Sequence, residues 1–373
     1  MFFKYILLIC GVLTPFTFGE ILPSADTEAI MRLVPSLNSV DFLDGPASVS
    51  HAITTPTTNS QPTLAEMEYY TNYAAAMYCQ YELNDLSCEP CKKFKKDVFD
   101  HTVIMNNNSD TSALVAVSKK REEIIVAFRG TMNIWNVILD VAAVAISYPN
   151  TPDGIKIHAG FHVATMSLYS DVVTNVGYLR GRYPSYKIVI SGQSLGGAMA
   201  RLTQFYLLAL NQFPGAKYEC YTYGEPRSGN QAFADFMNRQ TIKTARVVNN
   251  ADIVAHVAPV SLLSTKMLGD YYVHCQPEYW YVDENNQRFC NTSVYEDPTC
   301  SDSLGPDYSV TDHGMYLGVN YGPCLFGQPA PWAAIPFNIF QPVGMIPPLP
   351  RFMYNFNSAA ANFVMTALGW LGL

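Results

Sequence analysis

The feature that most constrains this chain is the signature of a sharp turn at residues 192–197. An apolar run at residues 188–190 is followed, after one serine, by Gly-Gln-Ser-Leu-Gly-Gly, and a segment rich in small residues and leucine continues to residue 210. Glycines on both sides allow a strand to turn abruptly into a closely packed helix. Such a turn presents the hydroxyl of Ser194 beside the backbone N–H of Leu195, which is the geometry of a serine nucleophile. Because the motif also arises by chance, it is the flanking strand and helix that favour this interpretation over an ordinary glycine–serine turn.

A serine of this kind needs an acid and then a histidine further along the chain. Asp252 follows the apolar run at residues 245–248, and the carboxyl end of such a strand is where the acid belongs. An ordinary turn aspartate is the competing interpretation. Asp270, Asp283 and Asp312 also lie downstream, but none follows an apolar strand so directly.

Three histidines follow the serine. His256 is only four residues from Asp252, too close to bridge it to Ser194. His274 falls in an expected strand at residues 271–275, where a structural role is equally reasonable. His313 lies near the end of the expected domain and is favoured, although the pattern alone gives it only a modest margin over His274.

Strands and helices are expected to alternate along the chain, which indicates an α/β fold with helices on both faces of a mostly parallel sheet. The expected strands are residues 113–117, 124–128, 155–158, 187–190, 218–223 and 245–248. The expected helices are residues 64–78, 162–182, 194–210 and 230–237. Thr63 and Glu66 have the spacing of a capping box at the start of the first helix. We therefore expect one catalytic domain of the α/β-hydrolase type at residues 64–324.

The ends of the chain differ from this domain in composition. Residues 1–19 combine Lys4 with a short apolar run, as in a secretory signal peptide, and the run is too short for a membrane span. Residues 20–63 end in a polar, proline-broken stretch and are interpreted as a pro-segment or linker. Residues 325–373 form a tail rich in proline, phenylalanine and alanine, with Arg351 as its single charge. This tail is expected to pack on the domain or to meet a lipid surface. Its apolar end is too short to span a membrane, and the pattern of a lipid-anchor signal is incomplete.

Cysteine content and charge narrow the class further. Of nine cysteines, Cys10 would leave with the signal peptide, and the remaining eight suggest disulfides in an oxidising compartment. Cys88 and Cys91 have a spacing also seen in zinc and redox motifs, but no second pair accompanies them. Asn107 and Asn291 stand in glycosylation tripeptides, consistent with secretion. A net charge of −8 without a basic cluster argues against a nucleic-acid partner.

Several ordered motifs make the chain resemble the filamentous-fungal triacylglycerol lipases (lipase class 3), from Leu64 to Cys324. The matching segments beside the serine turn are Ile-Val-Ala-Phe-Arg-Gly-Thr at 125–131, His-Ala-Gly-Phe at 158–161, Tyr-Pro-Ser-Tyr-Lys-Ile-Val at 183–189, Tyr-Gly-Glu-Pro-Arg at 223–227, Asn-Ala-Asp-Ile-Val at 250–254, Pro-Glu-Tyr-Trp at 277–280 and Asp-His at 312–313. The resemblance assigns the triad acid to Asp252 and the base to His313. It also implies that Thr131 and Leu195 form the oxyanion hole, with no metal or cofactor.

The resemblance further implies a lid after the oxyanion residue. Here that segment is short and apolar, which would suit exposure at an oil–water interface. Read without the family, it is more simply a buried helix or strand. The lid residues implied in this way are Ile134, Trp135, Val137, Ile138 and Leu139.

The family also implies three disulfides: Cys79–Cys324, Cys88–Cys91 and Cys290–Cys300. It gives no partner for Cys220 or Cys275, which are expected to be buried thiols. Two departures from the family pattern stand out. Gln193 replaces the usual histidine before the nucleophile, outside the triad, and Glu225 replaces a neutral residue.

The sequence thus predicts a secreted serine esterase that hydrolyses acylglycerols at a lipid–water interface through an acyl-enzyme. One alternative is a carboxylesterase or feruloyl esterase acting on soluble or cell-wall esters, to be distinguished by chain-length preference and response to an interface. A second is a non-catalytic homologue that binds lipid or cell wall, against which the complete triad argues. Oligomeric state, acyl-chain length and positional preference do not follow from the sequence.

Overall fold

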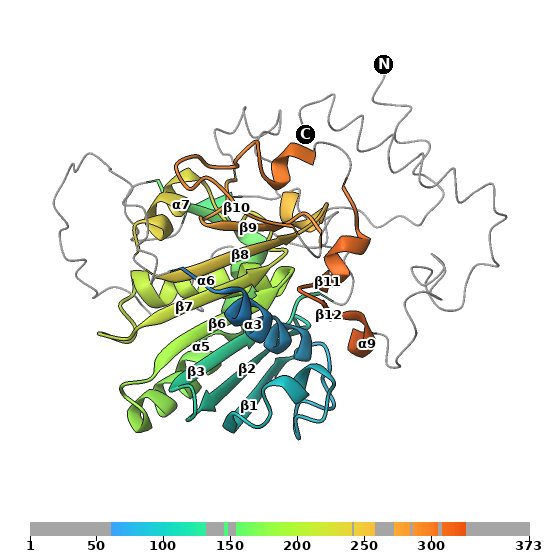
Figure 1. Ribbon diagram of the computed structural model, residues 1–373. Helices are drawn as coiled ribbons and strands as arrows, with labels where there is room; N and C mark the ends of the chain where they lie inside the picture. The colour runs from blue at the N-terminus through green and yellow to red at the C-terminus, as the bar shows by residue number, and fades with distance from the viewer. Residues whose placement is uncertain are drawn as a thin grey trace, which may run out of the picture. The chain divides into compact units, whose positions relative to one another are not determined.

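An eight-stranded sheet is the main element of the structure, a computed structural model that describes residues 61–131, 145–147, 154–240, 242–257, 272–283, 286–304 and 308–325 (Figure 1). All of these residues lie in the compact unit Ile53–Leu373. The strand order is β1-β2-β3-β6-β7-β8-β9-β10. The strands are β1 (Val98–Asn106), β2 (Thr111–Ser118), β3 (Glu123–Phe128), β6 (Lys187–Gln193), β7 (Tyr218–Tyr223), β8 (Lys243–Asn249), β9 (Glu278–Tyr281) and β10 (Gln287–Phe289).

The middle of this sheet is parallel and its edges are antiparallel. Strands β3, β6, β7, β8 and β9 run in the same direction. Strands β1 and β2 form an antiparallel meander onto β3, and β10 returns antiparallel to β9. Parallel strands end at a common edge, which is where open α/β sheets place their functional residues. The expected fold class, a mostly parallel sheet of the α/β-hydrolase type, is confirmed.

Helices cover both faces of the sheet (Figure 1). On one face α3 (Leu64–Ala76) packs against β3, β6 and β7. On the other face lie α5 (Ala159–Arg182) and α6 (Leu195–Ala209). Side chains alternate accordingly: Ile125 and Val189 face the cluster around α3, whereas Ile124 and Ile188 face α5 and α6. The central strands are apolar on both sides because both sides are covered.

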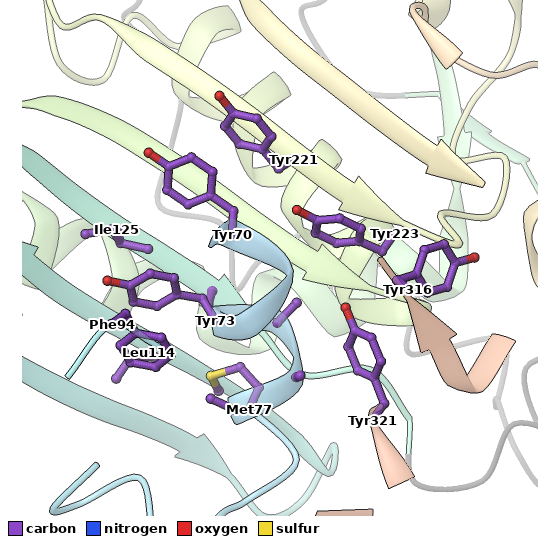
Figure 2. Close-up of a cluster of buried hydrophobic side chains, with 14 of the residues drawn as sticks. Tyr70, Tyr73, Met77, Phe94, Leu114, Ile125, Tyr221, Tyr223, Tyr316 and Tyr321 are labelled. Atoms are coloured by element: carbon purple, nitrogen blue, oxygen red, sulfur yellow. The ribbon is translucent and has the colours of Figure 1, made fainter. Parts of the chain in front are cut away.

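Tyrosines form much of the core beneath α3 (Figure 2). The ring of Tyr70 stacks on that of Tyr221 in β7, with centroids 4.3 Å apart, and Tyr73 stacks on Phe94 at 3.8 Å. Each buried hydroxyl needs a hydrogen-bond partner. Tyr223 meets this need by donating to the backbone carbonyl of Met67 at 2.6 Å. Such bonds, together with the ring contacts, hold α3 at one position on the sheet.

Short elements and disulfides complete the described part of the chain. The remaining elements are η2 (Pro90–Lys93), β4 (Ala145–Ser147), β5 (Lys156–His158), α7 (Gln231–Asn238), η3 (Val254–His256), η4 (Ser301–Leu304), η5 (Thr311–Gly314), β11 (Met315–Tyr316), β12 (Val319–Asn320) and α9 (Gly322–Leu325). The three disulfides that the family resemblance implied are present, and Cys79–Cys324 joins the end of α3 to α9. Cys220 and Cys275 are free and buried, and burial raises the pKa of each thiol to about 12.

Most of the expected elements exist, with three differences. The capping box of Thr63 and Glu66 starts α3 as predicted. The expected strand at residues 271–275 is wrong: this segment makes one isolated bridge, from Val273 to Gly229, because the chain there is held by loops rather than by a neighbouring strand. Residues 156–158 pair with β4 in a separate hairpin instead of joining the main sheet. Strands β1, β9 and β10 were not anticipated.

Several predicted segments lie outside the described residues: the signal peptide at 1–19, nearly all of the linker at 20–63, the lid residues 134–139 and the tail beyond Leu325. Within the described part of the chain, no helix combines the length and the apolar character needed to cross a bilayer.

Candidate active site

Ser194 lies on a strained turn between β6 and α6. Its backbone has φ 60° and ψ −132°, a left-handed conformation that costs a non-glycine residue about 1–3 kcal/mol. The turn is possible because a Cβ on Gly192 would overlap the backbone of Gly196, and one on Gly196 would overlap the carbonyl of Phe128. Helix α6 therefore approaches both β6 and β3 very closely. A backbone hydrogen bond of 2.9 Å from Ser194 to Tyr223 fixes the turn to β7.

Asp252 lies in the loop after β8, with its carboxylate fully buried. Its Oδ1 accepts a hydrogen bond from the backbone N–H of Val254 at 2.8 Å. Its Oδ2 accepts from His313 Nδ1, also at 2.8 Å, and from the hydroxyl of Tyr316. Burial and the neighbouring charge of Asp252 hold the pKa of Tyr316 well above its usual value, so this phenol stays a donor. The carboxylate thus has three donors and needs no water.

Asp312 ties the loop that carries Asp252 to the 3-10 helix η5 that carries His313. Its carboxylate accepts from the backbone N–H of Ala251 at 3.1 Å and from the side chain of Asn250 at 2.9 Å. Its backbone carbonyl accepts from the side chain of Asn249 at 3.0 Å. The acid adjacent to the histidine therefore serves the geometry of the site rather than its chemistry.

Gly224 allows the backbone after β7 to pass directly beside this pair. It has φ +56°, and a Cβ there would come within 2.8 Å of the Oδ2 of Asp252, the hydroxyl of Tyr316 and the Nδ1 of His313. Any larger residue would push the histidine off the carboxylate.

Thr131 follows β3 at the same edge of the sheet, next to the serine. A Cβ on the preceding residue, Gly130, would lie 2.9 Å from the Cβ of Ser194. Leu195 is the first residue of α6, so its backbone N–H points out of the helix end, where a developing negative charge is stabilised. The structure thus brings Ser194, Leu195, the segment 130–131, His313 and Asp252 together.

His313 does not bond to Ser194 directly in this structure. Its Nε2 lies 2.9 Å from the side-chain Nε2 of Gln193, and Ser194 Oγ is buried without a hydrogen-bond partner among the described residues. Sequence reasoning placed Gln193 outside the triad and attached no role to it. A contact between residues 120 positions apart leaves no local pattern in the sequence that could have revealed it.

The rejected candidates have other partners. The Nδ1 of His256 lies 2.8 Å from the backbone carbonyl of Asp252, its Nε2 lies 3.7 Å from the carboxylate of Asp302, and its ring stacks on Tyr308. His274 pairs with Glu296 at 3.0 Å. Burial opposes ionisation of Glu296, yet Arg227 and His274 hold its pKa well below the usual range. This buried network is structural and separate from the serine.

Other predicted positions are placed as follows. Asp283 lies in a turn, where it accepts from the backbone N–H of Asn286, and Asp270 lies outside the described residues. Asn107 and Asn291 are exposed. Among the described residues, two groups of side chains have metal-ligand spacing, but each contains both sulfurs of a disulfide and so offers no thiolate. These groups are Cys79, Glu82 and Cys324, and Glu278, Cys290 and Cys300.

The sheet is mostly parallel and carries a serine on a strand-to-helix turn. A buried acid and a histidine bonded to it follow along the chain. Together these features define a serine hydrolase of the α/β-hydrolase class. Comparison with known proteins narrows this class. The family profile Lipase (class 3) matches residues 125–262. A lipase of Rhizomucor miehei is 33% identical over 267 residues, covering 69% of this chain and 70% of that protein. The chain belongs to the class 3 lipase family.

Solved structures agree with this assignment. The structure of Rhizomucor miehei triacylglyceride lipase superposes with a TM-score of 0.63 at 32% identity, covering 72% of this chain and 98% of that one. A triacylglycerol lipase whose catalytic centre is described as a serine protease triad superposes with a TM-score of 0.61 at 33% identity, covering 70% of this chain and 96% of that one.

Proposed function

We propose that Ser194, His313 and Asp252 are the nucleophile, base and acid with which this class 3 lipase hydrolyses acylglycerol esters. The observation that carries the proposal is the 2.8 Å bond from His313 Nδ1 to the buried carboxylate of Asp252, beside a serine on a strained turn. A carboxylate accepts only, so Nδ1 carries the proton and Nε2 of the neutral ring bears the unprotonated electron pair that a base requires.

The reaction then follows from these groups. Ser194 Oγ attacks the ester carbonyl carbon while His313 Nε2 takes the hydroxyl proton. The tetrahedral intermediate collapses, its C–O bond to the glycerol breaks, and His313 gives the proton to the leaving glycerol oxygen. Water, deprotonated by the same histidine, next attacks the acyl carbon of the acyl-serine. The bond from this carbon to Ser194 Oγ breaks, the fatty acid is released, and His313 returns the proton to Oγ. Asp252 keeps the ring in the correct tautomer and stabilises its cation.

We assign the oxyanion hole to Leu195 and Thr131. The charge that develops on the ester oxygen needs donors that are already in place, and removal of one such donor costs about 10²–10³ in kcat in comparable enzymes. The helix N-terminus supplies the N–H of Leu195, and the closeness of Gly130 to Ser194 supports placing Thr131 at the same oxygen.

The site is proposed to act at a lipid–water interface. The apolar segment at residues 134–139, which contains Trp135, is the proposed lid and begins three residues after Thr131 in the sequence. A cover of this composition exposes apolar surface when it opens, which an oil droplet stabilises and water does not.

Secretion is proposed on independent grounds. Three disulfides in one domain fit an oxidising compartment, and residues 1–19 have the composition of a signal peptide. Residues 20–63 are the proposed pro-segment or linker, and the apolar tail at 325–373 is proposed to contact the domain or lipid.

The decisive experiment compares wild type with Ser194→Ala on two substrates, a soluble short-chain ester and an emulsified long-chain triacylglycerol. We expect wild type to prefer the emulsion and the variant to lose both activities by a factor on the order of 10⁴ or more. Activity on the soluble ester alone would make the protein an esterase. A folded wild type that cleaves neither would point to binding.

The lid has its own test, substitution of Trp135 and Ile138 by polar residues. Turnover of the emulsion should then fall while turnover of the dissolved ester is largely kept. Equal losses on both substrates would remove the argument for a lid.

A further inference from the structure

Gln193 has a buried carboxamide that bridges the catalytic histidine to the opposite side of the serine turn. It is the last residue of β6, only 2% exposed, and directly precedes Ser194. Its Nε2 lies 2.9 Å from both Nε2 and the backbone carbonyl of His313. Its Oε1 accepts from the hydroxyl of Tyr78 at 2.5 Å. The amide therefore uses both of its N–H donors and its oxygen within the protein.

The orientation of this amide follows from the chemistry of its neighbours. The Nδ1 of His313 faces the carboxylate of Asp252 and must carry the ring proton, so Nε2 can only accept. The carbonyl of His313 can only accept as well, whereas the Tyr78 phenol faces the other end of the amide as a donor. Rotating the amide by 180° would bring its oxygen against two acceptors and its NH₂ group against a donor, so the nitrogen must face the histidine.

This bond occupies the electron pair that the reaction needs. A base must accept the proton of Ser194 at Nε2, and in the structure that position is taken by the N–H of Gln193. Ser194 Oγ correspondingly has no hydrogen-bond partner within the described part of the chain. The observed arrangement is therefore a resting state of the triad, in which acid and base are aligned and the nucleophile is not activated.

We propose that Gln193 is a positioning residue that holds His313 Nε2 in this resting state, and that Ser194 becomes nucleophilic only when the carboxamide gives up that bond. The inference rests on the proposed roles of Ser194 and His313. It assigns a function to the position where this chain departs from the histidine usual in its family.

Tyr78 connects Gln193 to the oxyanion segment at residues 130–131. Its hydroxyl donates to Gln193 and interacts with the backbone N–H of Gly130, the residue before Thr131. Burial raises the pKa of Tyr78, so the phenol remains a donor. A hydrogen-bonded path thus runs from Gly130 through Tyr78 and Gln193 to His313. A substrate that displaces residues 130–131 would weaken the anchoring of the amide at the moment the base is required.

The test measures how readily Ser194 reacts in the full-length enzyme. The probe is diethyl p-nitrophenyl phosphate, which phosphorylates the activated serine and releases nitrophenolate. Gln193→Met keeps the length of the side chain and removes its donors. We expect the second-order inactivation constant and the acylation rate on a soluble ester to rise about three- to tenfold, the equivalent of one neutral hydrogen bond. KM should stay unchanged. Tyr78→Phe should change both constants in the same direction by a smaller factor.

Gln204→Met is the matched control. Gln204 is also a buried glutamine, 1% exposed, but it bonds to Arg201 within α6. Its replacement reports what losing a buried carboxamide does to the fold, and it should leave the inactivation constant unchanged.

A ¹⁵N NMR spectrum gives a readout independent of activity. The Nε2 resonance of His313, identified through His313→Asn, should move in Gln193→Met and stay in place in Gln204→Met.

The possible outcomes distinguish a failure of the role proposed for Gln193 from a failure of the proposed roles of Ser194 and His313. Wild type that does not react at Ser194 would overturn the assignment of the nucleophile itself. A second outcome is that wild type reacts stoichiometrically, while the folded Gln193→Met variant is inactivated at an equal or slower rate and its His313 resonance does not move. That outcome would overturn the role proposed for Gln193 and leave the assignment of the nucleophile intact. A slower reaction with a shifted resonance would also overturn that role, because the bond would then assist the base rather than restrain it.

Discussion

At the scale of single residues, the site depends on side chains outside the Ser194, His313 and Asp252 triad. Tyr316 illustrates this, because its phenol donates to the same carboxylate oxygen that orients His313. Tyr316→Phe removes one of three donors to a fully buried charge. Hydrogen bonds to charged groups contribute about 1.5–3 kcal/mol, so we expect kcat to fall on the order of tenfold or more, together with a lower free energy of unfolding. Steady-state kinetics and urea unfolding measure the two effects.

Tyr321→Phe distinguishes the two contributions. Tyr321 is a buried tyrosine directly after β12, and its hydroxyl bonds to Thr71 at 2.6 Å, away from Asp252. Its loss should lower stability by about 1 kcal/mol and leave kcat close to that of wild type. If both variants lost activity equally, general loosening of the core would explain the result and Tyr316 would have no specific part in orienting the base.

At the scale of elements, the position of α6 on the sheet sets the direction of the Leu195 N–H. Gly196→Ala would force the added methyl against the carbonyl of Phe128 and lift the helix from β3. Overpacking of this kind costs about 1–3 kcal/mol, and a displaced oxyanion donor should reduce kcat by about 10²-fold or more. Thermal unfolding and ester kinetics check the two consequences.

Gly177→Ala provides the contrast on the neighbouring helix α5. A Cβ there would meet only a ring carbon of Phe213, at an ordinary 3.6 Å. Alanine in a helix interior is favoured over glycine by about 0.5–1 kcal/mol, so the melting temperature should rise and activity should stay the same. Equal behaviour of the two variants would mean that helix propensity, and not the approach of α6 to the sheet, governs the effect.

At the scale of the whole molecule, the sequence predicted what local pattern encodes and missed what distant contacts create. The central parallel strands β3 and β6 have continuous apolar runs because both faces are covered, so they were recognised. Strand β1 escaped because it is an edge strand: most of its residues are exposed or half-buried, and its sequence mixes charged and apolar residues. Residues 271–275 looked like a strand by composition, yet within the described part of the chain their pairing is limited to the single bridge from Val273 to Gly229.

The same distinction applies to the site. The serine turn is local, so its motif identified Ser194. The pattern favoured His313 over His274 by only a modest margin, which the family resemblance then supported, because only the folded chain brings His313 to Asp252. Gln193 was noted only as a departure from the family pattern, with no role attached, and Tyr316 gave no signal, since each acts through a partner at least 64 positions away.

A prediction at this scale concerns stability against pH. Burial lowers the pKa of His158 to about 4 and also lowers the pKa values of His162 and His274. In the unfolded chain these groups titrate near 6.5. As the pH falls below about 6.5, these histidines therefore bind protons in the unfolded chain but not in the native state. The free energy of unfolding declines until the pH reaches the native pKa values. The carboxyl groups of Glu278 and Glu296 have lowered pKa values in the native state, so the stability that they contribute is lost only below about pH 4.5.

The free energy of unfolding should consequently drop between pH 7.5 and pH 5, by up to about 1.4 kcal/mol per pH unit for each buried histidine. Urea titrations at several pH values, with the disulfides intact, measure this slope. His158→Asn isolates one contribution: His158 accepts from the N–H of Phe161 as the N-cap of α5, and asparagine keeps an acceptor there without titrating. In the variant, the slope of unfolding free energy against pH should be smaller by up to the contribution of one proton, about 1.4 kcal/mol per pH unit. A wild type equally stable at both pH values would contradict the burial of neutral histidines, because a group that gains no proton on unfolding cannot make the stability depend on pH.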